Sequence, residues 1–466
     1  MTGMKLFKKD GLIKKVGQVA VPVALQNLLS TTGSMVDTIM LASLGELTVG
    51  AVGLCAQFSS LMFSCYWGFI GGGMLFFAQY WGARDEDGID RSYGMTVSCI
   101  AVVSAVFCML ALLAPELVMK IYTDKASIQA IGVEYMKIIG FNYPLMVLAV
   151  TMSSLLRSTE RVKIPLYASI AAVATNVFLN WVLIYGHLGA PAMGVKGAAL
   201  ATVIGSLVNL GVIIAATLIQ RYPYLYHFKK HFMWTGASLK EYFTKCFPII
   251  CNELFMGIST MIINIVIGRQ AEEAIAAVAV FRTLEGLVIG FFAGFSNAAS
   301  VLVGTAVGAG ELELAYDRGK RIVRMCAGVI FVICLGLNIL HTPVLTAMSL
   351  SGESLEIGTQ ILAIYTCAAV LRMCNWTRND TFRAAGDPVY GTILEIAFMY
   401  VMVLPVVCLA GLKWQWPFAA VFACCYIDEP VRFVLMVKHM NSGKYIKPVT
   451  PQGMAALPEF REKHGK

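Results

Sequence analysis

Charged residues are scarce in this chain. Only 14% of its 466 residues are Asp, Glu, Lys or Arg, whereas 58% are hydrophobic. A water-soluble domain needs a charged exterior, so this composition excludes an ordinary soluble protein. The HExxH, GxSxG and phosphate-binding-loop patterns of hydrolases and ATPases are also missing, and no clustered nucleophile or metal set indicates an enzyme. An ATP-driven pump is excluded for the same reason.

Cysteine is present without the spacing that would give it a chemical role. The 13 cysteines lie almost entirely in apolar stretches, and no CxxC pair occurs. Buried free cysteines behave as small hydrophobic side chains. The sequence therefore predicts no metal site and no disulfide framework, and no cofactor is expected.

Long apolar runs take the place of the missing charge. A helix that crosses the ~30 Å hydrocarbon layer needs about 20 apolar residues. The runs are continuously apolar rather than alternating, which favours helices over a β-barrel. We therefore predict an all-α polytopic membrane protein. About twelve spans are expected, near residues 16–44, 48–82, 92–114, 130–156, 164–186, 193–220, 241–268, 274–306, 322–340, 357–382, 389–411 and 416–437.

The positions of lysine and arginine predict the orientation of these spans. The basic N-terminal sequence MTGMKLFKKDGLIKK precedes a span too long for a signal peptide, so it is expected to stay as a cytoplasmic anchor. With the N-terminus inside, the outside loops hold only Lys120, Lys125, Lys196, Arg269 and Lys413. This imbalance predicts a multi-pass protein of the plasma (inner) membrane with both termini cytoplasmic. The net charge of +8 indicates orientation against an anionic leaflet, so nucleic acid is not an expected partner.

The chain matches itself without gaps when it is shifted by 226 residues. The shift places Pro22 on Pro248, Glu46 on Glu272, Gly68 on Gly294 and Arg157 on Arg383. We predict an N-terminal six-helix lobe (1–220), a cytoplasmic linker (221–240), a C-terminal six-helix lobe (241–440) and a cytoplasmic tail (441–466). Two parallel repeats suit a transporter that rocks one bundle against the other around a central cavity. A monomer is expected.

Asp37 is an acidic residue within an otherwise apolar span. Helix rise places Asp37 roughly 12 Å below the outer surface, Asn180 about 9 Å, Asn176 about 15 Å and Thr202 roughly 12 Å. These depths predict a polar pocket inside the first lobe. No Lys or Arg is expected at that level of these spans, so desolvation favours the protonated carboxyl, and a carboxyl that exchanges protons with the outside suits ion coupling. The alternative is a neutral Asp that only hydrogen-bonds neighbouring helices.

The second half contains a different set of charges. Glu253, Glu285 and Arg372 are predicted near mid-membrane on the seventh, eighth and tenth spans and form a candidate polar site. Acids and bases coexist here, so static or gating ion pairs compete with a cation-binding or substrate-binding role for Glu253. Pro22 permits a bend in the helix that carries Asp37, although a static kink is the alternative.

Several motifs resemble those of one transporter family. VPVALQNLLSTTGSMVDTIMLASLGE resembles the first helix of multidrug and toxic compound extrusion (MATE) transporters of the bacterial type. AQYWGARDED and GTAVGAGELE resemble the repeated loop that follows the second helix of each lobe. The resemblance continues over essentially the whole chain, through RSTERVKIP, NVFLNWVLIYGHLGAPAMGVKGAALAT, FPIICNELF and FRAAGDP.

This resemblance implies a fold, an activity and residue roles. It implies two six-helix lobes that form a V, alternating access between them, and export of cationic or amphipathic drugs in exchange for H⁺ or Na⁺, by a secondary active transporter rather than an enzyme. Asp37 corresponds to the acid of the N-terminal lobe, with Asn176 and Thr202 in its hydrogen-bond network. Pro22 corresponds to the bending proline and Glu253 to the acid of the seventh helix.

The chain departs from the family pattern in two places. Asn180 stands where some bacterial members have Asp, so Asp37 is expected to be the only acid of its pocket. The second carboxylate of the C-terminal lobe, which Na⁺-coupled members carry on the tenth helix, is expected to be missing. The aligned region carries Arg372, which would repel Na⁺. H⁺ is therefore favoured as the coupling ion, with Na⁺ as the alternative. A flippase for lipid-linked precursors, from the same superfamily, is less favoured. Such proteins often line the cavity with several basic residues that hold phosphates, whereas this chain has few predicted central basic residues, chiefly Arg372 and Arg282.

Overall fold

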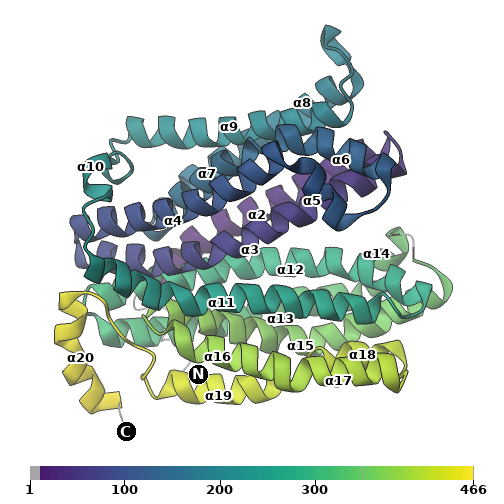
Figure 1. The fold of residues 1–466 in the computed structure, drawn as a ribbon. Helices are drawn as coiled ribbons and strands as arrows, with labels where there is room; N and C mark the ends of the chain where they lie inside the picture. The colour runs from purple at the N-terminus through teal and green to yellow at the C-terminus, as the bar shows by residue number, and fades with distance from the viewer. Residues whose placement is uncertain (1–10, 349, 465–466) are drawn as a thin grey trace. The chain divides into compact units, whose positions relative to one another are not determined.

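The protein is helical throughout the residues that the computed structural model describes, which are 11–348 and 350–464 (Figure 1). The long helices are α2 (Leu12–Ala42), α3 (Glu46–Ala83), α4 (Glu86–Leu113), α8 (Lys163–Tyr185), α9 (Val195–Ile219), α11 (Gly236–Ile267), α12 (Glu272–Gly308), α13 (Leu312–Ile339) and α15 (Gly352–Ala384). The shorter ones are α5 (Pro115–Tyr122), α6 (Ala126–Ile139), α7 (Asn142–Ser158), α10 (Phe228–His231), α14 (His341–Ala347), α16 (Pro388–Phe398), α17 (Leu404–Cys408), α18 (Phe418–Cys424), α19 (Glu429–Asn441) and α20 (Pro451–His464). Short 3₁₀ turns occur at His187–Gly189 and Pro223–Leu225.

Most of the expected membrane spans are single helices. Within the described residues, ten helical stretches are long and apolar enough to cross a membrane, and the bent pair α6 and α7 supplies an eleventh. One of the ten, Pro388–Lys413, joins α16 and α17 through the π-helical turn Met399–Val403 and ends in a second π-helical turn, Leu409–Lys413. A π turn next to Pro405 is expected, because proline lacks the amide hydrogen that a regular α-helix needs.

Two expected spans are broken rather than continuous. The helices α6 and α7 meet at an angle of 49°, where the sequence predicted one helix over 130–156. Pro144 lies in the first turn of α7 and cannot donate a backbone hydrogen bond to the turn before it. The last span, predicted over 416–437, consists of α18 and α19 with non-helical residues between them. Asp428 lies at this break, where a buried charge needs a partner.

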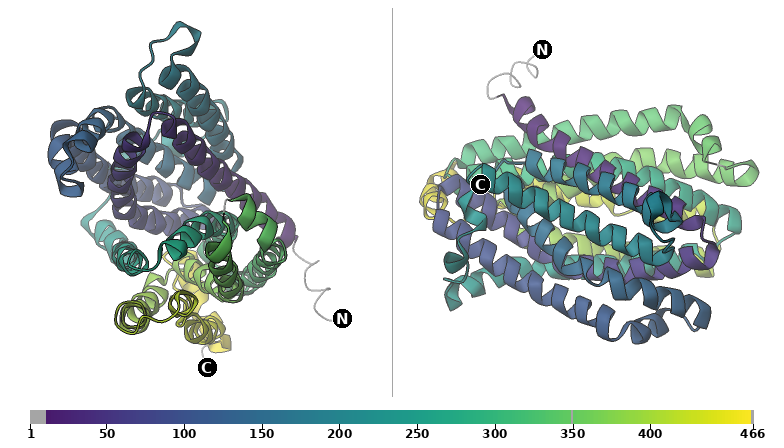
Figure 2. Two further views of the ribbon diagram at one scale, coloured as in Figure 1. Left: turned by 90° about the vertical axis from the view of Figure 1, so that its right-hand side faces the viewer. Right: turned by 90° about the horizontal axis from the view of Figure 1, so that it is seen from above.

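The helices form two compact units. The N-terminal unit contains residues 25–73 and 86–242, and the C-terminal unit contains the described residues up to Ala24, residues 74–85, and the chain from Phe243 onward. The units therefore do not follow the halves 1–220 and 241–440 completely, because α2 and α3 each contribute to both. The boundary between the two units falls after Ala24 in α2, which is two residues after Pro22, and directly after Gly73 in α3. Figure 2 shows the helices in two further views.

Backbones approach closely where α3 ends in the C-terminal unit. A Cβ atom at Gly82 would clash with the backbone of Thr305, and one at Gly308 would clash with the backbone of Gln79. Glycine is needed at such positions because only it lets two backbones come so near. The fully buried Gln79 side chain then donates to the carbonyl of Ala384 at 2.9 Å and accepts from the amide of Val449 at 2.9 Å.

The expected linker, 221–240, is a packed segment of the N-terminal unit. Its side chains contact the acidic first turns of α4: Tyr224 Oη donates to Glu86 at 3.1 Å, and Lys230 Nζ lies 2.9 Å from Asp87. His227 Nδ1 lies 2.8 Å from the buried carboxylate of Asp90. Acids at a helix N-terminus are also favoured by the helix dipole. The polar composition of this segment thus reflects contacts with α4.

The expected tail, 441–466, is also folded against the C-terminal unit as far as it is described. Thr450 Oγ1 donates to the carbonyl of Gly308 at 2.8 Å, and His464 Nε2 lies 2.9 Å from Glu313. Upstream, the Asp387 carboxylate, only 2% exposed, lies 3.2 Å from His439 Nε2 and 3.0 Å from Lys447 Nζ. Asp387 therefore joins the start of α16 to α19 and to the tail.

Acid is expected to weaken this junction. Burial acts to raise the pKa of Asp387, but the hydrogen bonds and charges of His439 and Lys447 outweigh it and lower that pKa below its ordinary 3.8. A depressed folded-state pKa means that the carboxylate contributes stability above its unfolded pKa, and that this stability is lost as the pH falls through the folded-state pKa. We expect the melting temperature of the wild type to drop more steeply than that of Asp387→Asn below about pH 4. Parallel melting curves in detergent would contradict this.

Candidate functional site

Four polar side chains from three helices of the N-terminal unit form one hydrogen-bonded chain. Asn180 Nδ2 donates to Asp37 Oδ1 at 2.6 Å and to Asn176 Oδ1 at 3.3 Å. Asn176 Nδ2 donates to Thr202 Oγ1 at 3.3 Å, and Thr202 Oγ1 donates to the carbonyl of Ala198 at 3.0 Å. The structure thus brings together all four residues that helix rise placed at one level.

The helix geometry explains why these side chains meet. Asp37 lies on α2, near its end, and Thr202 lies on α9. Asn176 and Asn180 are four residues apart on α8, so they share one face of that helix. Gly205 of α9 lets the two helices come close, because a Cβ there would lie 3.2 Å from Asn176 Cβ. Small residues at such crossings are typical of helix packing in membranes.

Asp37 is partly exposed, and the described part of the chain gives it no cationic partner. Among the described residues, no Lys, Arg or His nitrogen lies within ion-pair distance of its carboxylate. Only its Oδ1 atom accepts a hydrogen bond within that part of the chain. A carboxylate in an apolar helix without a cation is costly as an anion, which makes Asp37 a candidate for a functional role.

Asn180 provides both kinds of partner that a titrating carboxyl group needs. Its side chain is 1% exposed, and its Oδ1 atom is buried without a hydrogen-bond partner in the described chain. The amide NH₂ group suits an ionised Asp37, which only accepts hydrogen bonds. A protonated Asp37 can donate, and the unused Oδ1 atom becomes its acceptor after the amide turns over. The pair can therefore stabilise either protonation state.

Glu253 of α11 belongs to a separate group in the C-terminal unit. Its Oε1 atom lies 3.9 Å from Arg383 Nη1, and the same nitrogen lies 3.7 Å from Asp380 Oδ1. Ser296 of α12 hydrogen-bonds the other oxygen of Asp380. Asp380 of α15 is thus a second carboxylate beside Arg383, so the expectation that the tenth span contributes none is wrong. The signal was its spacing of three residues before Arg383, which suits an ion pair on one helix.

Glu285 and Arg372 pair with each other rather than with Glu253. Arg372 Nη1 donates to Glu285 Oε1 at 3.1 Å. The guanidinium also lies over the rings of Trp376, at 4.5 Å, and Tyr426, at 5.3 Å. Aromatic faces stabilise a partly buried cation in this way. The three residues proposed as one polar site are thus divided between two ion-paired groups.

A third group of charges surrounds Arg432 of α19. The guanidinium lies 3.0 Å from Asp428, 3.4 Å from Glu395 and 3.7 Å from Glu429. All four residues are at most 4% exposed. Amides complete the group, because Asn379 donates to Glu395 at 3.1 Å and Asn375 donates to Glu429 at 2.8 Å. Asp428 was missed although it lies four residues before Arg432, a spacing that suits an ion pair on one helix. The two amides were missed because their partners come from other helices.

Known proteins match this chain over most of its length. The MatE family model matches residues 22–182 and 248–409. The chain is similar to the uncharacterised transporter YisQ of Bacillus subtilis (strain 168), with 22% identity over 426 residues that cover 90% of this chain and 91% of YisQ. It is also similar to the probable multidrug resistance protein NorM of Burkholderia pseudomallei (strain K96243), with 27% identity over 329 residues that cover 70% of this chain and 69% of NorM.

Solved structures share the fold. A crystal structure of MATE in the straight conformation superposes with a TM-score of 0.83 at 19% identity, over 95% of this chain and 99% of that one. An outward-facing multidrug resistance MATE family transporter of the MOP superfamily gives a TM-score of 0.82 at 19% identity, over 95% and 99%. The predicted fold class, an all-α membrane protein of twelve helices in two lobes, is thereby confirmed.

Proposed function

This chain belongs to the MatE family of transporters, and from that premise we propose that it is a proton-coupled antiporter that exports cationic or amphipathic compounds by alternating access. It is a transporter rather than an enzyme. The observation that carries the proposal is the hydrogen-bonded chain from Asp37 through Asn180 and Asn176 to Thr202. The multidrug resistance protein NorM, a relative, supports the substrate class. The plasma membrane, with both chain termini on the cytoplasmic side, is the proposed location.

The donor and acceptor pattern supports H⁺ over Na⁺. Asn176 Oδ1 and Thr202 Oγ1 already accept hydrogen bonds, and Asn180 directs its NH₂ group rather than its oxygen at Asp37. A hard metal cation is held by several oxygens, so its binding would require these hydrogen bonds to break. A proton needs only the Asp37 carboxylate and one acceptor, which Asn180 Oδ1 supplies.

Protonation can be linked to helix shape through α2. Asp37 and Pro22 lie on this one helix, and Pro22 leaves the carbonyl of Gln18 without its usual helical donor. A helix with a missing hydrogen bond bends at lower cost than a regular helix. We propose that gain or loss of the Asp37 proton shifts α2 between two shapes, and that Pro22 is where it bends.

The basic residues do not favour the lipid-precursor flippase. Such a transporter would hold anionic phosphates on cationic side chains that face the cavity. Arg372 is paired with Glu285, and Arg282 donates to Asn264 at 2.6 Å. The two arginines expected to serve a flippase are thus bonded to other side chains, which supports the antiporter.

Ethidium export from proteoliposomes tests the coupling ion. The protein is reconstituted and an inward-directed gradient of either H⁺ or Na⁺ is imposed at equal ionic strength. We expect ethidium to move only under the pH gradient. Movement under the Na⁺ gradient alone would overturn the choice of ion and keep the family. No movement under either gradient would reject ethidium as a substrate and with it the proposed compound class.

Glu253→Gln is expected to slow export without uncoupling it. The variant removes one of two carboxylates that face Arg383, and Asp380 stays in place to balance that guanidinium. We expect the export rate to fall by no more than about fivefold, the change that a loss of roughly 1 kcal/mol produces. Asp380→Asn is the matched variant on the other side of Arg383. Complete loss of pH-driven export in Glu253→Gln would instead assign Glu253 to ion or substrate binding.

A further inference from the structure

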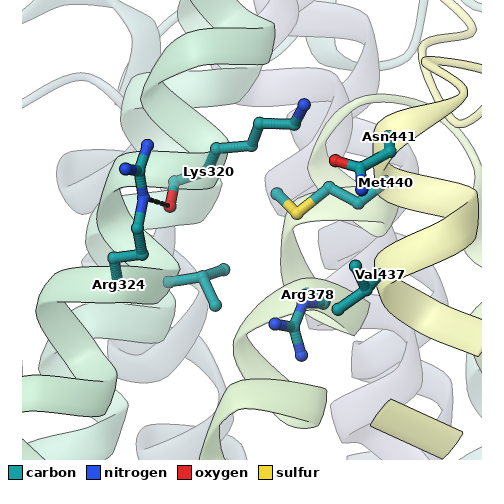
Figure 3. A pocket seen from close by; sticks show the side chains of 7 residues that line it. Lys320, Arg324, Arg378, Val437, Met440 and Asn441 are labelled. Atoms are coloured by element: carbon teal, nitrogen blue, oxygen red, sulfur yellow. Dashed lines mark hydrogen bonds between the residues drawn. The ribbon is translucent and has the colours of Figure 1, made fainter. Parts of the chain in front are cut away.

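A cavity of about 250 Å³ lies between α13, α15 and α19 in the C-terminal unit (Figure 3). Its polar lining consists of Lys320 and Arg324 from α13, Arg378 from α15 and Asn441 at the end of α19. No carboxylate lines it within the described residues. The cavity therefore presents three positive charges and one amide to whatever occupies it.

Arg378 is the buried base of this cavity. Its side chain is 6% exposed, yet no carboxylate in the described parts of the chain forms an ion pair with it. Its Nη1 atom donates to Asn375 Oδ1 at 3.4 Å, its guanidinium lies 4.2 Å from the centre of the Phe433 ring, and its Nε atom is buried without a hydrogen-bond partner. A buried guanidinium without a carboxylate partner favours the binding of an anion, because burying an unpaired charge is costly.

The two basic residues that α13 contributes to the cavity form no ion pair within the described residues. Lys320 Nζ donates to Tyr316 Oη at 2.6 Å and lies 3.9 Å from the centre of its ring, and Arg324 Nε donates to the carbonyl of Lys320 at 3.2 Å. None of these contacts neutralises a charge. The nearby acids of α13 are engaged elsewhere, since Asp317 pairs with Arg321 at 2.6 Å and Glu313 pairs with Lys463 at 3.1 Å.

The cavity lies at the end of the helices predicted to face the cytoplasm. Lys320 and Arg324 follow the start of α13, while Arg378 and Asn441 lie close to the ends of α15 and α19. The cytoplasmic leaflet carries anionic lipids, and basic pockets between membrane helices on this side bind their headgroups. The remaining lining is apolar, with Val323, Val437 and Met440. Apolar side chains next to cations suit a ligand that carries a charge beside a hydrocarbon chain.

We propose that this cavity binds a phosphate group of net negative charge, carried by a phospholipid of the cytoplasmic leaflet or free in the cytosol. Arg378 offers a planar fork of donors to the phosphate oxygens, and Lys320 and Arg324 add charge at the mouth. The cavity is separate from the hydrogen-bonded chain that contains Asp37, because that chain belongs to the other unit.

Calorimetric titration of the full-length protein in a nonionic detergent tests the proposal. The probes are dihexanoyl phosphatidylglycerol, dihexanoyl phosphatidylcholine and inorganic phosphate, each below micelle-forming concentration. The test variant is Lys320→Gln/Arg324→Gln, which leaves the buried Arg378 in place. The matched control is Lys163→Gln/Lys229→Gln, which removes two exposed lysines outside the cavity. Melting temperatures verify that both variants are folded.

We expect saturable binding of phosphatidylglycerol that weakens about 25-fold in the test variant, fivefold for each cation removed, and less than twofold in the control. Phosphatidylcholine should bind at least tenfold more weakly than phosphatidylglycerol. Inorganic phosphate that competes at equal affinity would assign the site to free phosphate, whereas no competition would assign it to the lipid headgroup. Equal binding of both lipids, or unchanged binding in the test variant, would overturn the proposal.

Discussion

Asp37→Asn is expected to reduce pH-driven export to the rate of protein-free liposomes while leaving the protein folded. Asparagine has nearly the same size as aspartate and can keep a hydrogen bond to Asn180, so the packing of α2 against α8 is preserved. It cannot bind or release a proton near neutral pH. Because no other acid belongs to this hydrogen-bonded chain, nothing within it replaces the lost carboxyl group.

The measurement is ethidium export from proteoliposomes under an imposed pH gradient, with protein content matched between samples. Asp124→Asn is the control, since Asp124 is exposed between α5 and α6 and its loss removes the same charge. Ethidium binding to the detergent-solubilised protein separates lost coupling from lost recognition. Wild-type export by Asp37→Asn would show that Asp37 only hydrogen-bonds its neighbours and that the proton is carried elsewhere.

Arg432→Met is expected to lower the free energy of unfolding by about 3–5 kcal/mol. The variant keeps an unbranched apolar stem but removes the cation that faces Asp428, Glu395 and Glu429. Three buried carboxyl groups then have no positive partner, and each must take up a proton or stay charged at a high cost. Unfolding by sodium dodecyl sulfate in mixed micelles measures the loss, and thermal melting gives an independent value.

Two further variants identify the cause of this loss. Arg282→Met is the control, because Arg282 is exposed and its bond is to the amide of Asn264 rather than to an acid. The combination of Arg432→Met with Glu395→Gln and Glu429→Gln removes most of the uncompensated charge, so we expect it to be more stable than Arg432→Met alone. If the combined variant is no more stable, packing rather than charge explains the role of Arg432.

The N-terminal site was predictable because its geometry is local to regular helices. Helix rise alone places Asp37, Asn176, Asn180 and Thr202 at one level. The structure adds the direction of each hydrogen bond, which depth cannot supply. In particular, the unpartnered Oδ1 atom of Asn180 depends on how the amide is turned and has no signal in the sequence.

The charges of the C-terminal half were less predictable because their partners come from distant parts of the chain. Glu253 pairs with Arg383, 130 positions later, and Glu395 pairs with Arg432 across two helices. The depth of an acid in the membrane limits which basic residues could pair with it, but it does not identify the partner when several basic residues lie at similar depths. The break between α18 and α19 was missed for a similar reason, since an apolar run does not show where a buried ion cluster interrupts the helix.

In the proton exchange that we propose, the single carboxyl group in the hydrogen-bonded chain of Asp37 also limits the energetics. One ionisable group carries at most one proton per cycle, and one proton against one monovalent cation moves no net charge across the bilayer. Voltage, worth about 2.3 kcal/mol per charge at 100 mV, then contributes nothing to the driving force. The steepest gradient of exported compound is tenfold for each unit of pH difference, or about 1.4 kcal/mol. Under the proposed one-for-one exchange, a membrane that is strongly polarised but has equal pH on both sides would drive no accumulation of the exported cation.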